Sequence, residues 1–174
     1  MKKMFFALFC AVLFAVSAQA QTITVSFRNA DDTKSRWPFV EKKFTKEPAV
    51  TEATVTLKNT KYKFAFTSTS GMYLNSKLGL MFGGESGNSI KLPAVKGKTL
   101  AKVSVKFGGK GNVGRPAVTD VKGNLLAGGN PVKSPDINYV HTWEVSGAKK
   151  GKPSCLTLTH DSVAKVKEIV LEYE

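Results

Sequence analysis

The chain has 174 residues and carries 26 Lys or Arg against 13 Asp or Glu, which gives a formal charge of +13 at pH 7. Its two cysteines and two histidines do not stand in the Cys-x-x-Cys or His-x-x-x-His spacings of a zinc site, and two cysteines are too few for a disulfide-rich scaffold. The length suits a single domain that can bury a core of its own.

The first twenty residues have the pattern of an export signal. Two lysines precede an apolar run over residues 4–16, and residues 17–20 read Ser-Ala-Gln-Ala. Small residues in an A-x-A ending are typical of a cleavage site, and the run is shorter than the about 20 apolar residues that span a bilayer. The alternatives are a buried N-terminal helix or a lipid anchor at Cys10, although Cys10 lies inside the apolar run. We predict a signal peptide over residues 1–20 and a soluble mature protein that is secreted, periplasmic or at the cell surface.

The mature chain, residues 21–174, is predicted to be one domain. Loss of the two leader lysines lowers its formal charge from +13 to +11. Cys155 is the only cysteine left, so no intramolecular disulfide can form, although the compartment permits one. Because no Cys-x-x-Cys or paired-histidine motif accompanies Cys155, we interpret it as a small strand residue rather than a nucleophile or redox thiol.

Apolar and polar residues alternate in short runs along almost the whole mature chain. This two-residue period is typical of strands with one buried and one solvated face, as in antiparallel sheets. No stretch of a dozen residues shows the 3.6-residue period of a helix. The alternating segments are residues 23–27, 54–57, 62–66, 90–92, 102–107, 141–145, 156–159 and 167–173.

Glycines separate these runs, as expected where strands reverse direction. Residues 120–124, Asp-Val-Lys-Gly-Asn, indicate a hairpin. Eight to ten short strands of this kind favour an all-β fold, an antiparallel β-sandwich of jelly-roll or galactose-binding-like type. One short helix is conceivable near residues 38–43, residues 29–48 are the least regular stretch, and residues 128–139 form the longest loop.

Several motifs occur in the same order as in a known family that this chain resembles. They are Trp37-Pro38, Leu92-Pro93-Ala94, Gly97-Lys98, Val118-Thr119-Asp120 with Gly123-Asn124, Trp143 and the terminal Tyr173-Glu174. Together they resemble a family of secreted Bacteroidetes domains with a galactose-binding-like sandwich fold, similar to carbohydrate-binding modules. The resemblance implies glycan binding outside the cytoplasm and supplies no catalytic residues.

The sequence offers no recognisable catalytic set, and we expect a protein that is not an enzyme. Glycoside hydrolysis needs two carboxyl groups facing one bond, and no spacing singles out such a pair. Ser86 in GGESGN is one residue off the nucleophile-elbow pattern and is interpreted as part of a turn. The chain has only His141 and His160 as histidines, and no cofactor or transition-metal site is expected. Asp31-Asp32 and Asp120 could join a structural Ca²⁺ site, although aspartates that cap turns are the favoured interpretation.

Sugar binding is the chemistry that the sequence favours. A pyranose has an apolar C–H face and a rim of hydroxyls, so proteins bind it with an exposed aromatic ring and nearby polar groups. The alternative for each ring is packing in the core or in a loop, and Trp143 is assigned to the core. The candidate binding residues are the rings of Trp37, Tyr73, Phe82 and Tyr139, with Asn88 and Arg115 as polar partners. Other polar loop residues near these rings in the sequence are Arg36, Asn75, Asn130 and Asn138.

The basic charge has two interpretations. Most lysines fall on outward strand positions, where they solvate the sheets and protect edge strands. Alternatively, they attract a polyanion such as an acidic glycan or another polymer of the cell exterior. With only three arginines and no stacking motif, specific nucleic-acid binding is not expected.

These observations predict a secreted, non-catalytic module that binds carbohydrate, including anionic glycans. One alternative is an extracellular structural or protein-interaction module without a small ligand. Another is a hydrolase whose carboxylates come together only in the fold. The oligomeric state stays open.

Overall fold

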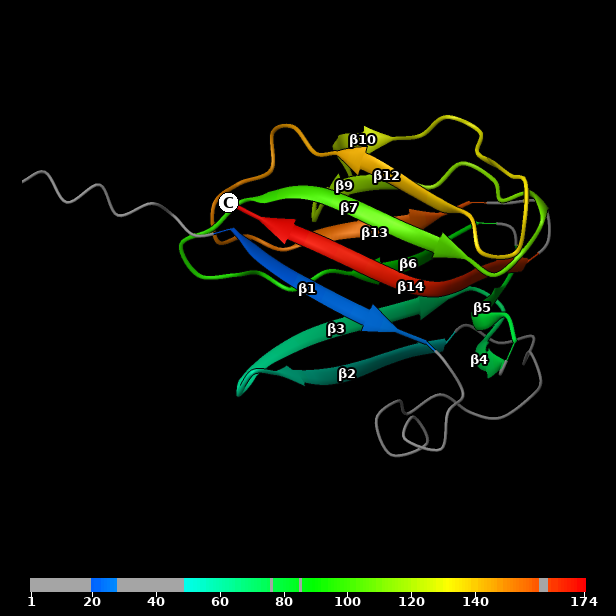
Figure 1. Cartoon of the computed structure of the whole chain (residues 1–174), viewed down its shortest axis with the longest axis horizontal. Helices are drawn as coiled ribbons and strands as arrows, with labels where there is room; N and C mark the ends of the chain where they lie inside the picture. Colours follow the sequence, from blue (N-terminus) through cyan, green and yellow to red (C-terminus); the bar gives the residue numbers. More distant parts are fainter. Residues whose placement is uncertain (1–19, 28–48, 76, 85, 160–162) are drawn as a thin grey trace, which may run out of the picture.

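Two antiparallel sheets stack face to face in this protein (Figure 1). The computed structural model describes residues 20–27, 49–75, 77–84, 86–159 and 163–174. Trp37, the helix considered near residues 38–43 and all of the predicted signal peptide except Ala20 lie outside these ranges. Within them, no helix has the length and apolarity needed to cross a membrane.

The first sheet is built around the last strand of the chain. Its strands are Gln21–Ser26 (β1), Met72–Asn75 (β4), Gly79–Gly83 (β5), Leu100–Phe107 (β7), Val140–Glu144 (β12) and Val163–Tyr173 (β14). The order is β12-β7-β14-β5-β4, and β1 also pairs with β14. β7 follows one edge of β14, whereas β5 and β1 share the other edge, at residues 163–166 and 168–173.

A β-bulge at Lys167 divides β14 into two halves. The register with β7 shifts between Val166 and Glu168, and the buried residues change from even positions to odd positions there. The Lys167 carbonyl accepts a hydrogen bond of 2.7 Å from the backbone N–H of Phe27. An extra residue of this kind re-aims the side chains of a strand. It explains why the alternation predicted over residues 167–173 does not extend back to Val163.

The second sheet has the order β10-β9-β13-β6-β3-β2. Its strands are Ala49–Leu57 (β2), Thr60–Ser68 (β3), Asn88–Lys91 (β6), Ala117–Asp120 (β9), Leu125–Gly128 (β10) and Ser154–Leu158 (β13). A small ladder joins Gly111–Asn112 (β8) to Lys133–Ser134 (β11). Each of the eight alternating segments overlaps a strand, so the prediction of an all-β antiparallel sandwich is confirmed.

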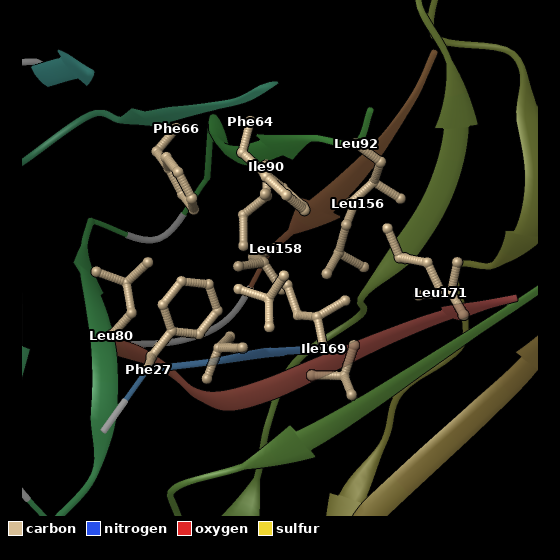
Figure 2. Packing of buried hydrophobic residues seen from close by; sticks show 14 of the residues in the cluster. Phe27, Phe64, Phe66, Leu80, Ile90, Leu92, Leu156, Leu158, Ile169 and Leu171 are labelled. Atoms are coloured by element: carbon tan, nitrogen blue, oxygen red, sulfur yellow. The ribbon is translucent and has the colours of Figure 1, made fainter. Parts of the chain in front are cut away.

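Side chains from both sheets fill one continuous core (Figure 2). Phe66 of β3 meets Phe27, which directly follows β1, in an edge-to-face contact with ring centroids 5.9 Å apart. Such pairs contribute about 0.5–1.5 kcal/mol beyond the burial of their area. Trp143 is 8% exposed and belongs to this core, as predicted.

The predicted hairpin at residues 120–124 is confirmed and is held by one carboxylate. Asp120 Oδ1 accepts hydrogen bonds from the backbone N–H groups of Lys122 (2.8 Å) and Asn124 (2.9 Å), and Oδ2 accepts one from Asn124 Nδ2 (2.8 Å). These bonds favour the charged form, so the pKa of Asp120 is lowered, mainly by the Asn124 side chain. Both carboxylate oxygens of Asp120 therefore accept hydrogen bonds within its own turn.

Asp120→Asn should make the free energy of unfolding fall less steeply as the pH is lowered. A carboxyl group with a lowered pKa stabilises the fold above its unfolded-state pKa, near 3.8, and loses that contribution as the pH falls through the folded-state pKa. Urea unfolding should show the variant less stable than the wild type at pH 6, with a gap that narrows below about pH 4. Glu52→Gln, on the exposed face of β2, is the control. A gap that stays constant from pH 6 to pH 3 would contradict this role.

Candidate functional site

Two of the predicted binding residues are structural, and this corrects the sequence interpretation. Phe82 lies in β5, is 0% exposed and belongs to the core, so its ring cannot meet a ligand at the surface. Asn88 is 1% exposed, and its side chain is used internally. Its Nδ2 donates to the carbonyl of Gly84 (3.0 Å), and its Oδ1 accepts from the backbone N–H of Thr69 (3.3 Å). Asn88 therefore joins two loops instead of binding a ligand.

The other described candidates are at the surface but do not form one site. Tyr73 is half-buried in β4, and Tyr139 is half-buried just before β12. β4 and β12 are the opposite edges of the first sheet, so the two rings cannot share one small ligand. Arg115 is exposed in the segment that leads into β9, and its backbone N–H donates to the carbonyl of Thr159 (2.6 Å).

Tyr139 is the outermost member of an aromatic row along the edge strand β12. Its ring centroid lies 5.9 Å from that of His141, which lies 4.5 Å from that of Trp143. Alternate residues of a strand share a face, and His141 and Trp143 stand opposite Val105 and Val103 of β7. The row therefore runs from the buried indole of Trp143 to the partly exposed phenol of Tyr139.

Hydrogen bonds hold the Tyr139 ring in place. Its hydroxyl lies 3.1 Å from His141 Nδ1, and its carbonyl accepts from the backbone N–H of Phe107 (2.9 Å). Burial lowers the pKa of His141, so the imidazole is neutral at pH 7 and its Nδ1 can accept the hydroxyl proton. The ring is thus positioned before any ligand arrives.

A tight turn with exposed polar groups directly precedes Tyr139 in the chain. Asp136 Oδ1 accepts from the backbone N–H of Asn138 (2.7 Å), and the Asn138 side-chain oxygen accepts from Lys167 Nζ (3.1 Å). The bulge in β14 supplies this lysine. Ile137, between the two turn residues, is 48% exposed. We call Ile137, Asn138, Tyr139, His141 and Lys167 the Tyr139 platform.

The platform combines an apolar ring, an aliphatic side chain, an amide and an ammonium group, which is chemistry suited to binding rather than to bond cleavage. Of these residues, the sequence pattern predicted Tyr139 as a candidate ring and Asn138 as a polar loop residue. Ile137 was overlooked because it is aliphatic, and Lys167 because nothing local marks a bulge. The Asp-x-Asn spacing of residues 136–138 was the one readable signal, since it is typical of an Asx turn.

The remaining reactive groups do not assemble around the platform. Among the described residues, no three His, Cys, Asp or Glu side chains gather closely enough to hold a metal ion, and Asp31 and Asp32 lie outside those residues. Cys155 is a half-buried residue of β13, as predicted, and burial raises the pKa of its thiol. No protein-family profile matches the chain, and no curated protein is detectably similar to it in sequence.

Proposed function

We propose that this protein is an exported, non-catalytic carbohydrate-binding module and that the Tyr139 platform contacts the sugar. The observation that carries the proposal is the half-buried Tyr139 ring, which is fixed against His141 and follows Asn138, the residue bonded to Lys167, in the chain. The export signal predicted over residues 1–20 and the resemblance to secreted galactose-binding-like domains support the same proposal.

The apolar and polar groups of the Tyr139 platform match the two kinds of surface that a sugar presents. The phenol ring of Tyr139 and the Ile137 side chain offer apolar area to the C–H face of a pyranose. The Asn138 amide and the Lys167 ammonium group supply donors for the hydroxyl rim. Because the Asx turn and the tyrosine–histidine bond fix these groups in advance, binding loses little side-chain entropy. A modest affinity follows from so small a contact area.

Tyr139→Ala should weaken glycan binding by about tenfold or more, since it removes the outermost and largest aromatic ring of the platform. The wild-type mature chain is first screened on a glycan array of neutral and charged sugars, and the best ligand is then titrated by calorimetry. Tyr73→Ala removes a second half-buried tyrosine at the opposite sheet edge and should change the affinity less than twofold. Circular dichroism and thermal unfolding confirm that both variants are folded.

Two results would reject the proposal. A wild-type chain that binds no glycan on the array would reject carbohydrate binding. Equal affinities for the wild type and Tyr139→Ala would reject the platform as the site.

The second candidate function is a protein-interaction module, and exposed apolar residues on two edge strands favour it. Val50 in β2 is 72% exposed, and Leu125 in β10 is 62% exposed. β2 and β10 are the two edges of the second sheet, and edge strands pair readily with other chains. Binding of a protein partner that Val50→Lys abolishes, together with an empty glycan array, would favour this function.

A further inference from the structure

The tripeptide Lys-Gly-Lys occurs twice, in turns of the same geometry. Residues 96–98 lie between β6 and β7, and residues 150–152 lie between β12 and β13. The backbone N–H of Lys98 donates to the carbonyl of Val95, and that of Lys152 donates to the carbonyl of Lys149, both at 3.1 Å.

In each turn the third residue is a glycine with positive φ, +74° at Gly97 and +67° at Gly151. This is the geometry of a type II turn, which requires glycine at that position. The lysine on each side of the glycine therefore leaves the turn on a fixed backbone. We call residues 95–98 and 149–152 the paired lysine turns.

The paired lysine turns contact each other although they are far apart in the sequence. The backbone N–H of Gly151 donates to the carbonyl of Lys98 (2.7 Å), and a Cβ atom at Gly151 would lie 3.9 Å from Gly97 N. Figure 1 shows both connections, green and orange, meeting at the end of the sandwich marked C. Five lysines thus originate from two turns that are bonded to each other.

Among the residues that the structure describes, the loops at this end contain no acidic residue. The connections 92–99 and 145–153 contain five lysines and no Asp or Glu. The β2–β3 and β9–β10 turns add Lys58 and Lys122 and are equally free of acidic residues. The antiparallel register, in which Ser154 pairs with Asp120, brings the β9–β10 turn to the same end.

Two acidic side chains at the neighbouring strand ends are already engaged. Asp120 is committed to its own hairpin turn, and Glu144 lies 3.2 Å from Lys102 Nζ. Glu174 is exposed, and its two hydrogen bonds to Thr99 are backbone bonds, so its side-chain carboxylate offsets part of the charge of the five lysines. The like charges that remain where the two turns meet repel one another, and an anion shared between them relieves the repulsion.

We propose that the paired lysine turns bind the sulfate or carboxylate groups of an extended acidic polysaccharide. The inference rests on the proposed glycan-binding function for its choice of ligand and places a second contact at the opposite end of β12 from Tyr139. Ammonium groups bind anions as point charges without demanding a geometry. The two turns contain no aromatic or arginine side chain on which a base could stack, which favours a polysaccharide over a nucleic acid.

The test uses the mature chain and heparin as a model sulfated polysaccharide. The triple variant Lys96→Gln, Lys150→Gln, Lys152→Gln removes three exposed charges from the turns and keeps both glycines. The control, Lys77→Gln, Lys110→Gln, Lys133→Gln, removes three exposed charges elsewhere. We expect the turn variant to lose at least about tenfold in heparin affinity and the slope of log K against log salt to become about 2 units less steep. The control should lose less than about threefold.

Each contrary result rejects a defined part of the inference. Equal losses in the two variants would mean that net charge, rather than the turns, attracts heparin. Duplex DNA of matched charge that binds as tightly as heparin, with the same lysine dependence, would reject the polysaccharide as the preferred class. A wild type that binds neutral glycans but not heparin would reject the turns and keep the Tyr139 platform. Lysine-dependent heparin binding that Tyr139→Ala leaves unchanged, without binding of any neutral glycan, would keep the turns and reject the platform. Unchanged thermal unfolding confirms that both variants are folded.

Discussion

Phe66→Ala should lower the free energy of unfolding by about 3–5 kcal/mol, the range found when a buried phenylalanine is truncated. Phe66 is 0% exposed and lies in β3 of the second sheet. It stacks on Phe64, with centroids 6.3 Å apart, and meets Phe27 of the other layer edge to face. The substitution therefore removes apolar burial, leaves a cavity and breaks an aromatic contact between the two sheets.

The matched control is Thr67→Ala, at the next position of the same strand. Thr67 points to the outer face, between Val50 of β2 and Ser89 of β6, and is partly exposed. Its truncation should cost less than about 1 kcal/mol, in line with surface positions. Urea unfolding followed by fluorescence measures both variants. Similar losses at residues 66 and 67 would contradict a β3 with one buried and one solvated face.

Alternation in the sequence predicted eight of the strands and missed β4, the short strands β8 to β11, and β5, which has no wet face. In β5 all five residues, Gly79 to Gly83, are buried. A strand covered on both faces needs no polar positions, so it reads as a short apolar run without a period. For this reason Phe82 was assigned to a surface loop although it belongs to the core.

The candidate site was predictable only where the signal is local. Tyr139 stood out because it precedes an alternating strand, but the bond between its neighbour Asn138 and Lys167 depends on strand order and on a bulge. Likewise, each Lys-Gly-Lys turn can be recognised in the sequence. The bond between Gly151 and Lys98 cannot, because it arises from the way the chain crosses between the sheets.

The fold also separates the two proposed contacts. Tyr139 comes just before β12, and the second lysine turn comes after its end, so one edge strand links the platform to the paired lysine turns. A strand of five residues spans roughly 17 Å at about 3.4 Å per residue. A single extended polysaccharide is long enough to reach from one contact to the other, which would add avidity to two weak sites.

Gly108→Ala should destabilise the fold by about 3 kcal/mol or more, because the new methyl group would meet backbone rather than a movable side chain. A Cβ atom at Gly108 would lie 1.9 Å from the carbonyl oxygen of Leu78. Neither the backbone at Gly108 nor that at Leu78 can move away easily, because each is held by a hydrogen bond. The Gly108 N–H donates to the carbonyl of Lys165 (2.9 Å), and the Leu78 N–H donates to Asn75 Oδ1 (3.0 Å).

Gly109→Ala is the control, since it makes the same change at the next residue. There the nearest atom to a new Cβ is Lys165 Cδ at 3.2 Å, on a flexible side chain that can rotate away. Both substitutions restrict the unfolded chain equally, so that contribution cancels in the comparison. Thermal unfolding should place the midpoint of Gly108→Ala about 6 °C or more below that of Gly109→Ala. Equal midpoints would show that Gly108, just after β7, does not pack against Leu78 of the β4–β5 turn in solution.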